Sequence, residues 1–213
     1  MPSKPLMNQT LICKICFNSI KTNTGYYLLH HNTCLCEKCQ SELKPHFNGF
    51  ISDNIKCISI YKYDDKIKSL LYQLKGCYDI EIASIFLDRF KRELSLRFHG
   101  YVVIPVPSDK ESNNARGFNH VQEIFKSLKL KMIPAIQKTM KHKQSDMKKE
   151  ERKNVIKYFK WDNSFDINNK KILIVDDVYT TGSTINAIIS LVKEHNPKTI
   201  RVLVLSKVEE HTN

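Results

Sequence analysis

A chain of 213 residues is long enough for one α/β domain with its own core and a small appended unit, but too short for two large domains. Hydrophobic residues make up 41% and charged residues 26%, a composition that excludes a wholly disordered chain. Lys and Arg outnumber Asp and Glu by 34 to 22, which gives a formal net charge of +12. That excess fits a phosphate-rich partner, although a lysine-rich surface that binds nothing explains it equally well.

The first residues, MPSKPLMNQTLICKICF, contain no apolar stretch of signal-peptide length, and no later segment approaches the length of a membrane span. We therefore expect a cytoplasmic protein, with at most peripheral recruitment to the inner face of the membrane. Seven cysteines in such a reducing compartment indicate metal binding or chemistry rather than disulfides.

Four of these cysteines form two C-x-x-C pairs at the spacing of a zinc ribbon. Because four thiolates fill a tetrahedral shell and leave no position for water, the predicted metal is a structural Zn²⁺ bound by Cys13, Cys16, Cys36 and Cys39. Cys34, His30 or His31 could replace one ligand, and two chance pairs of buried thiols are the alternative. We place the zinc-binding domain at residues 1–55, where the metal would supply folding free energy that so short a segment lacks.

The second predicted domain, residues 56–213, alternates between strand and helix patterns. Residues 57–63 alternate as a strand, and a helix with an apolar i, i+3, i+4, i+7 face ends near Gly76. A longer helical pattern covers residues 80–98, and YVVIPVP, residues 101–107, is typical of a strand buried on both faces.

A polar loop is predicted at residues 108–119, followed by a helix around Val121 to Leu128, a short strand at 132–137 and a polar arm at 138–160. The pattern closes with a strand at 171–175, a helix at 183–195 and a strand at 200–205. Strands that alternate with helices predict βαβ units and a parallel sheet covered on both faces.

The stretch ILIVDDVYTTGST, residues 172–184, places two carboxylates and a Thr/Gly/Ser-rich loop at the end of a predicted parallel strand, where α/β sheets bind ligands. Backbone N–H groups of the loop and of the following helix can surround an anion, and Gly182 lets the backbone approach it closely. Asp176 and Asp177 can accept hydrogen bonds from sugar hydroxyls or hold a Mg²⁺ shell. This combination indicates a sugar phosphate, and an ordinary strand-to-helix turn is the alternative.

This stretch resembles the phosphoribosyl-pyrophosphate motif of type I phosphoribosyltransferases. The two C-x-x-C pairs, L-K-G at residues 74–76, A-R-G-F-N at 115–119 and K-Q-S at 143–145 extend the resemblance to the ComF family over nearly the whole chain. That family belongs to bacterial natural competence, the uptake of DNA as a single strand. The resemblance implies a type I phosphoribosyltransferase-like fold, a parallel sheet flanked by helices, behind a zinc-ribbon-like domain.

The resemblance also implies the residues of a binding site for phosphoribosyl pyrophosphate. Asp176 and Asp177 would bind the ribose 2′ and 3′ hydroxyls, and the 5′-phosphate would bind at Thr180, Thr181, Gly182, Ser183 and Thr184. The loop after the first core strand would hold the pyrophosphate with its Mg²⁺ through Ser108 and Lys110. Further candidates for stabilising the diphosphate charge are Lys75, Arg116 and Lys143.

Catalysis is a separate question, and no catalytic residue is assigned. Thr180 stands where purine-salvage members of the enzyme family carry an Asp base, whereas pyrimidine-type members carry Thr there and still catalyse. The position after R-G-F-N usually holds Gln in the ComF family, but here it holds His120. An active phosphoribosyltransferase with an unidentified acceptor therefore stays an alternative.

The other hypothesis is a protein that binds phosphoribosyl pyrophosphate and handles single-stranded DNA. Residues 157–161, KYFKW, interleave basic and aromatic side chains as single-strand platforms do. The candidate DNA contacts are Lys157, Tyr158, Lys160 and Trp161, although Phe159 and one neighbour could face the core instead. The family resemblance adds a ComFA-like helicase or ATPase as a partner of the zinc domain.

Overall fold

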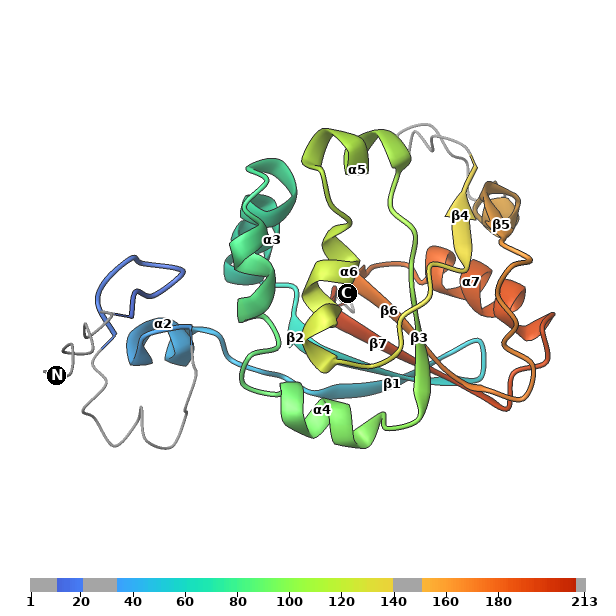
Figure 1. Ribbon diagram of the computed structural model, residues 1–213, viewed down its shortest axis with the longest axis horizontal. Helices are drawn as coiled ribbons and strands as arrows, with labels where there is room; N and C mark the ends of the chain where they lie inside the picture. Colours follow the sequence, from blue (N-terminus) through green and yellow to red (C-terminus); the bar gives the residue numbers. More distant parts are fainter. Residues whose placement is uncertain (1–10, 21–33, 140–150, 210–213) are drawn as a thin grey trace, which may run out of the picture. The chain divides into compact units, whose positions relative to one another are not determined.

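The computed structural model describes residues 11–20, 34–139 and 151–209, and the chain forms two compact units that divide between Lys44 and Pro45 (Figure 1). This division lies before the boundary that we expected at residue 55. Strand β1 (Asn48–Ser52) pairs antiparallel with β2 (Ile55–Lys62), so it belongs to the main sheet rather than to the first unit. Among the described residues, no helix has both the length and the apolar character needed to cross a membrane.

The first unit contains a cysteine turn and helix α2 (Glu37–Glu42). An antiparallel bridge joins Ile12 to Ser19, and between them the Cys13 N–H donates to the Asn18 carbonyl at 2.9 Å. The Lys14 N–H donates to the carbonyl of Cys34 at 3.0 Å. This bond ties the turn that carries the first cysteine pair to the segment that enters α2 with the second pair.

The second unit is built on a five-stranded sheet of order β1-β2-β7-β6-β3. Strands β3 (Tyr101–Pro105), β6 (Lys171–Tyr179) and β7 (Thr199–Lys207) run parallel to one another and to β2. Residues 172–177 of β6 are all buried, as expected of a strand covered on both faces. The predicted α/β class with a largely parallel sheet is therefore confirmed.

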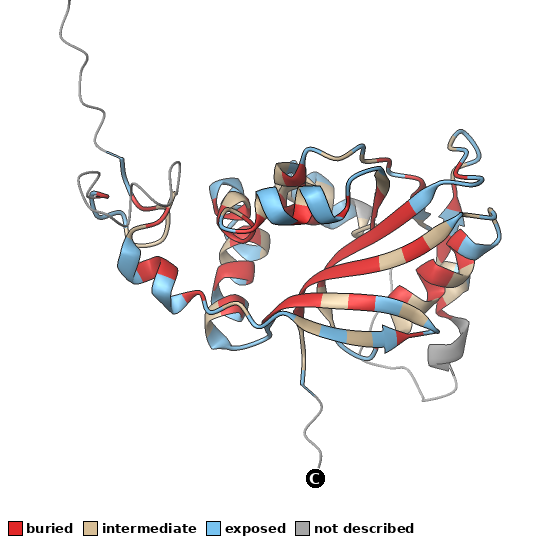
Figure 2. Cartoon of the chain, turned by 90° about the horizontal axis from the view of Figure 1, so that it is seen from below, coloured by how far each residue is buried: buried red, intermediate tan, exposed pale blue. Residues whose placement is uncertain are grey.

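Helices cover the sheet. Helix α7 (Ser183–Lys193) packs against β5 (Phe159–Trp161) and η4 (Glu151–Tyr158), and α6 (His120–Phe125) packs against β6 and η1 (Ile80–Ile85). Helix α3 (Asp65–Gly76) begins after Asp64, whose side chain accepts the Ile67 N–H, and it buries the apolar face that the sequence predicts. Figure 2 shows the buried residues concentrated along the strands and on the helix sides that face them.

Residues 80–98 do not form the single helix that their periodicity predicts. They form η1, a turn and then α4 (Lys91–Arg97). Ile85, Phe86 and Leu87 are consecutive and all buried, whereas a straight surface helix buries only one stripe. The break lets the chain bury residues that would otherwise point in different directions.

Three other segments differ from expectation. The predicted polar loop contains helix α5 (Lys110–Arg116), which begins with the Asp109 side chain accepting the Ser112 N–H at 3.2 Å, and which lacks the apolar face that would have revealed it. The short strand β4 (Ile136–Lys138) pairs with β5 in a separate sheet, and η2 (Lys126–Leu128) extends α6. Strand β6 continues past residue 175, so Asp176 and Asp177 lie inside it.

Candidate functional site

The carboxyl ends of β2, β3, β6 and β7 meet at one edge of the sheet because these strands are parallel. Asp176 and Asp177, both buried, lie near the end of β6, and Ser108 follows the end of β3. A cavity of about 630 Å³ is lined by all three side chains. Its volume is in the range of small-molecule and cofactor sites.

The two carboxylates of β6 are held in different states. Asp176 Oδ1 accepts the Asp177 backbone N–H at 2.9 Å, and Asp177 Oδ1 accepts the Val178 N–H at 2.8 Å. Burial, reinforced by the charge of Asp177, raises the pKa of Asp176 well above its ordinary value. Burial also opposes ionisation of Asp177, but His120 and Lys75 outweigh it and hold the pKa of Asp177 below its usual range. The pair thus joins one ionised carboxylate to one that protonates readily.

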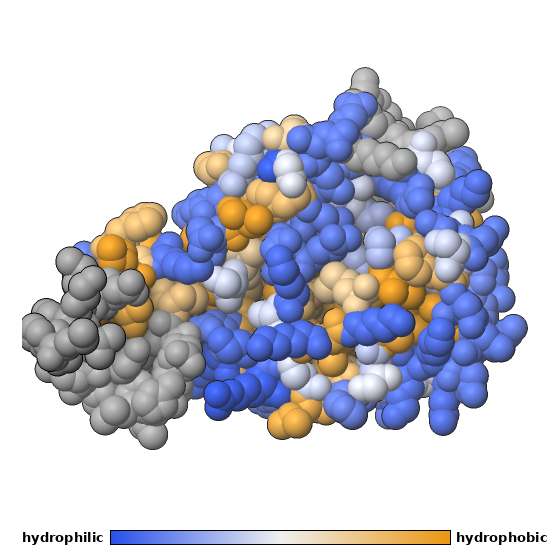
Figure 3. Space-filling view, in the orientation of Figure 1, coloured by the Kyte–Doolittle hydropathy of each residue, from blue (hydrophilic) through white to orange (hydrophobic). Residues whose placement is uncertain are grey.

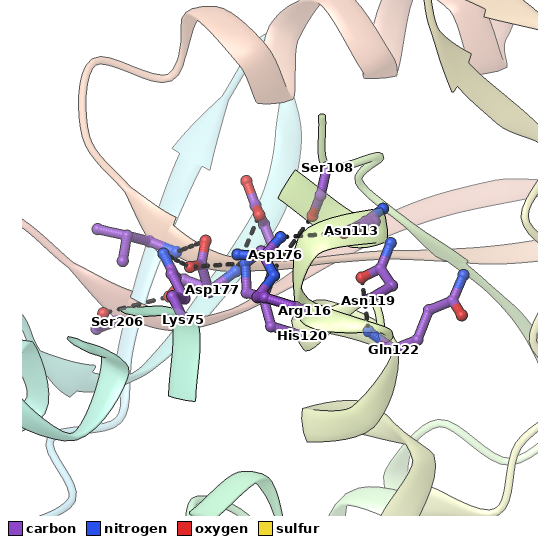
Figure 4. Close-up of polar contacts among 11 residues, drawn as sticks. Lys75, Ser108, Asn113, Arg116, Asn119, His120, Gln122, Asp176, Asp177 and Ser206 are labelled. Atoms are coloured by element: carbon purple, nitrogen blue, oxygen red, sulfur yellow. Dashed lines mark hydrogen bonds and ion pairs between the residues drawn. The ribbon is translucent and has the colours of Figure 1, made fainter. Parts of the chain in front are cut away.

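His120 connects the ionised carboxylate to the loop after β3 (Figure 4). Its Nε2 lies 3.2 Å from Asp177 Oδ2, and its Nδ1 lies 3.3 Å from Ser108 Oγ. Burial lowers the pKa of His120, so the ring is neutral at pH 7. Because an ionised carboxylate only accepts, Nε2 carries the proton, and Nδ1 accepts the hydroxyl proton of Ser108.

The R-G-F-N motif is the corner between α5 and α6. Gly117, at φ +77°, ends α5 in the left-handed region, and the Asn119 side chain accepts the Gln122 N–H at 3.2 Å to begin α6. The residues that flank this corner, Arg116 and His120, both line the cavity. The motif therefore has a structural reason that its sequence alone does not reveal.

Arg116 has an unused donor. Its Nη2 donates to Asn113 Oδ1 at 3.0 Å, but its buried Nε has no hydrogen-bond partner in the part of the chain that the structure describes. Burial lowers the pKa of Arg116, which still carries its charge at pH 7. A buried guanidinium N–H without an acceptor fits an anionic ligand such as a diphosphate.

The loop after β6 has the geometry of an anion cradle at the start of α7, with backbone donors that can hold an anion. The first N–H groups of this helix lack partners within it, and no side chain caps them. Gly182, at φ +75°, precedes the helix, and a Cβ there would lie 2.2 Å from the hydroxyl oxygen of Tyr179. That hydroxyl is fixed by a 2.9 Å hydrogen bond to Ser52 Oγ. Glycine is therefore required both by the backbone and by the neighbouring ring.

The cavity brings together most of the predicted sugar-phosphate residues, which are Lys75, Ser108, Arg116, Asp176, Asp177, Thr180, Gly182 and Thr184. Thr181 and Ser183 are not among its lining residues, and their hydroxyls pair with each other at 3.0 Å. Lys110 begins α5, but its side chain, like the whole of Lys143, lies outside the described residues. His120 was not predicted as a site residue, and its place directly after R-G-F-N was the available signal.

The predicted DNA contacts among residues 157–161 differ in their exposure to solvent. Lys157 and Lys160 are exposed, and Lys157 Nζ lies 5.4 Å from the centre of the Tyr158 ring. Tyr158 is half-buried and lines the cavity rather than an outer surface.

Trp161 is a core residue, so the prediction that it contacts DNA is wrong. Its side chain is only 7% exposed, its Nε1–H donates to the Phe165 carbonyl at 3.2 Å, and its ring stacks on His195 with centroids 4.0 Å apart. The physical reason is the alternation of β5, which turns its first and third residues inward and its middle residue to solvent.

The first unit contains a candidate metal centre. The Sγ atoms of Cys13, Cys16, Cys36 and Cys39 all lie within 4.8 Å of one another. Cys16 Sγ and Cys36 Sγ are 3.7 Å apart, close to the edge of about 3.8 Å expected for a tetrahedron with Zn–S bonds of about 2.3 Å. Among the described residues Cys34 is not part of the cluster, and His30 and His31 lie outside those residues. The cluster can hold a tetrahedral metal ion.

Backbone donors lower the pKa of one cysteine in this cluster. Burial opposes ionisation of Cys13, but N–H groups of Ile15, Cys16 and Cys36 point at its sulfur and lower its pKa to about 7. Burial raises the pKa of Cys36 and Cys39, so the backbone donors favour the thiolate, the form that a metal binds, at Cys13.

Known proteins resemble the chain over most of its length. Residues 115–212 match the phosphoribosyl transferase domain. The chain is 25% identical to competence protein ComFC of Streptococcus pneumoniae, over 91% of this chain and 98% of that protein. It is 27% identical to competence protein ComFC of Bacillus subtilis, over 83% and 86%. The chain is a ComFC-like protein.

Similarity to enzymes is more local. A 50-residue segment of the ComFC-like chain is 44% identical to the hypoxanthine-guanine phosphoribosyltransferase of Canis lupus familiaris, covering 24% of this chain and 23% of that enzyme. A solved hypoxanthine phosphoribosyltransferase from Staphylococcus aureus is similar over 60% of this chain and 64% of its own, with a TM-score of 0.40 and 13% identity.

Proposed function

We propose that this ComFC-like protein binds phosphoribosyl pyrophosphate with Mg²⁺ in the cavity at the end of β6. The observation that carries the proposal is the anion cradle at the start of α7 beside the two buried carboxylates Asp176 and Asp177. A 5′-phosphate needs free N–H donors, and ribose hydroxyls need acceptors a few ångströms away. One short segment of this chain supplies both.

Two cationic side chains that line the cavity can serve the diphosphate end. The unused Nε–H of Arg116 and the ammonium group of Lys75, which is paired with Asp177 before a ligand binds, belong to side chains that line the cavity. When bound, Mg²⁺ would be held mainly by diphosphate oxygens and water, and it would neutralise part of their charge. The chain's own task is to fix the ribose and both phosphate ends at once.

A melting experiment with ligand fragments tests this division of the cavity. Phosphoribosyl pyrophosphate with Mg²⁺ should raise the melting temperature more than ribose 5-phosphate or pyrophosphate does at the same concentration, since only the whole ligand engages both ends. Equal shifts from all three compounds would mean that the cavity binds anions without recognising the sugar diphosphate.

We also propose that the protein contacts single-stranded DNA in natural competence. The net charge of +12 and the likeness to two competence proteins support this role. Binding carried by phosphate contacts should weaken steeply between low and physiological salt, as measured by fluorescence anisotropy of a labelled oligonucleotide. Affinity that does not change with salt would contradict the electrostatic contact. Docking of a ComFA-like helicase on a zinc-bound first unit is the accompanying proposal from the family resemblance.

Phosphoribosyl transfer is the second candidate function. The segment that resembles hypoxanthine-guanine phosphoribosyltransferase favours it, whereas Thr180, in place of the Asp base of purine-salvage enzymes, weighs against a purine acceptor. Pyrophosphate release can be measured across a panel of nucleobases, with and without single-stranded DNA. Release would identify an enzyme, and binding without release would identify a sensor.

A further inference from the structure

Two tyrosines beside the larger cavity, Tyr63 and Tyr72, are partly or largely exposed. Tyr63 directly follows β2 and is 36% exposed, and Tyr72, on α3, is 66% exposed. Within the described residues neither hydroxyl has a hydrogen-bond partner. Leaving aromatic rings in water forgoes the stabilisation of burial, so their position calls for a reason other than core packing.

These tyrosines line a second cavity, of about 560 Å³. Tyr63 and Lys75 line both this cavity and the larger one that holds Asp177, so the two hollows adjoin. Lys68 also lines the second cavity, together with one acidic residue of the first helical turn, Asp65. A ligand in the second cavity would therefore lie next to the proposed sugar-diphosphate site.

The Tyr72 ring packs over Gly76. A Cβ on Gly76 would lie 2.9 Å from Cε2 of that ring, closer than real contacts allow. Gly76 is the last residue of α3 and does not adopt a left-handed φ, so the helix backbone does not require glycine there. Glycine is unfavourable in a helix, but here it lets the aromatic ring lie flat against the end of α3.

The charges around the rings suit a phosphate backbone. Lys68 precedes Tyr72 by one helical turn and so shares its side of α3, whereas Lys75, at i+3, is paired with Asp177 in the adjoining cavity. Hydrophilic side chains cover much of this molecular face, with apolar side chains among them around α3 (Figure 3). Exposed aromatic rings beside a lysine such as Lys68 suit a single strand, since bases stack on rings while phosphates pair with cations.

We propose that Tyr63 and Tyr72 form a stacking platform for bases of single-stranded DNA, beside the phosphoribosyl pyrophosphate cavity. The proposal rests on the DNA contact of the proposed function but does not require the sugar diphosphate to bind. It assigns the aromatic contact to α3 and the end of β2, instead of to the segment that contains the buried Trp161.

Base stacking can be separated from backbone attraction with two labelled strands of equal length, an oligothymidylate and an abasic strand with the same phosphates. Fluorescence anisotropy should show that the wild-type protein prefers the oligothymidylate. Tyr72→Ala and Tyr63→Ala should each lower the affinity for the oligothymidylate by about five- to 150-fold, the range for loss of one stacked base. Each should also remove the preference for that strand over the abasic one. Tyr72→Phe should keep it, because the ring remains.

The controls make each result decisive. Lys157→Ala should lower the affinity for both strands alike and leave the ratio of the two affinities unchanged. An unaltered unfolding midpoint for Tyr72→Ala would establish that this variant is folded. An unchanged ratio in both alanine variants would overturn the platform while leaving the DNA contact intact. Failure of the wild-type protein to bind either strand would overturn both, whereas calorimetry with phosphoribosyl pyrophosphate would still report separately on the cavity. If free thymine competes fully with the oligothymidylate at equal base concentration, the stacking platform is a small-molecule site and the strand proposal is overturned.

Discussion

Lys75 and Asp177 form an ion pair inside the cavity that we propose binds phosphoribosyl pyrophosphate. The same Asp177 oxygen lies 3.2 Å from His120 Nε2, and the other oxygen accepts the Val178 backbone N–H at 2.8 Å. Both carboxylate oxygens thus have donors before a ligand arrives. We expect a ribose hydroxyl to displace Lys75 from this carboxylate, an exchange that would free the ammonium group for the diphosphate.

Replacing Lys75 should weaken the binding of phosphoribosyl pyrophosphate but not that of ribose 5-phosphate. Lys75→Met keeps much of the side-chain volume but removes the charge. It should weaken phosphoribosyl pyrophosphate about ten- to a hundredfold, the value of one charge-assisted hydrogen bond, and should leave ribose 5-phosphate unchanged or bound more tightly. Calorimetric titration of both ligands measures the difference. Lys68→Met is the matched control, because Lys68 lines only the second cavity, and equal losses for the two ligands would contradict the exchange.

The two carboxylates should respond to neutralisation in opposite directions. The folded-state pKa of Asp176 is raised, so its contribution to stability is present below its ordinary pKa of about 3.9 and is lost as the pH rises through the folded value. Asp176→Asn keeps an acceptor for the Asp177 N–H without a second charge. It should therefore raise the free energy of unfolding at pH 7, and this gain should shrink toward about pH 4.

The contribution of Asp177 to stability has the opposite pH dependence. Its folded-state pKa is lowered, so its contribution is present above its ordinary pKa and is lost as the pH falls through the folded value. Asp177→Asn should lower the free energy of unfolding at pH 7 by about 1–3 kcal/mol, because Lys75 and His120 lose a charged acceptor. Urea denaturation of both variants across pH measures these changes, and a shift of the same sign in both would refute the assigned charge states.

Adding a methyl group at Gly182 should disrupt the anion cradle. Gly182→Ala meets both a left-handed φ of +75° and a contact of 2.2 Å with the Tyr179 hydroxyl oxygen. It should cost about 1–3 kcal/mol of unfolding free energy and should abolish the thermal shift from ribose 5-phosphate. Gly49→Ala is the control, since no heavy atom lies within 4 Å of its added Cβ. Retained ribose 5-phosphate binding in Gly182→Ala would mean that this loop does not hold the 5′-phosphate.

The metal centre can be tested one thiol at a time. Cys16→Ser should lose bound zinc, whereas Cys34→Ser should keep it, because Cys34 is outside the cluster of four sulfur atoms. Metal analysis of the purified variants measures the content. Chelation should leave phosphoribosyl pyrophosphate binding intact, since the second unit has its own sheet and core. Full zinc content in Cys16→Ser, or zinc loss in Cys34→Ser, would require a different ligand set.

What the sequence could predict depended on how far apart the contributing residues lie. The acidic pair and the cradle after it were predictable because they occupy one strand and the loop that follows it. The link from Ser108 through His120 to Asp177 was not predictable, because it depends on how the corner between α5 and α6 packs against β6. Trp161 was misassigned because a three-residue strand is too short to decide which of its residues face the core.

The cavity itself is tested most directly by calorimetric titration of phosphoribosyl pyrophosphate with Mg²⁺ into the wild-type protein, the double variant Asp176→Asn with Asp177→Asn, and Gly49→Ala. Circular dichroism would first establish that all three are folded. We expect saturable binding at one site in the wild-type protein and in Gly49→Ala, and none in the double variant. Absence of binding to the wild-type protein, or an unchanged affinity in the double variant, would contradict the proposal that this cavity holds the sugar diphosphate.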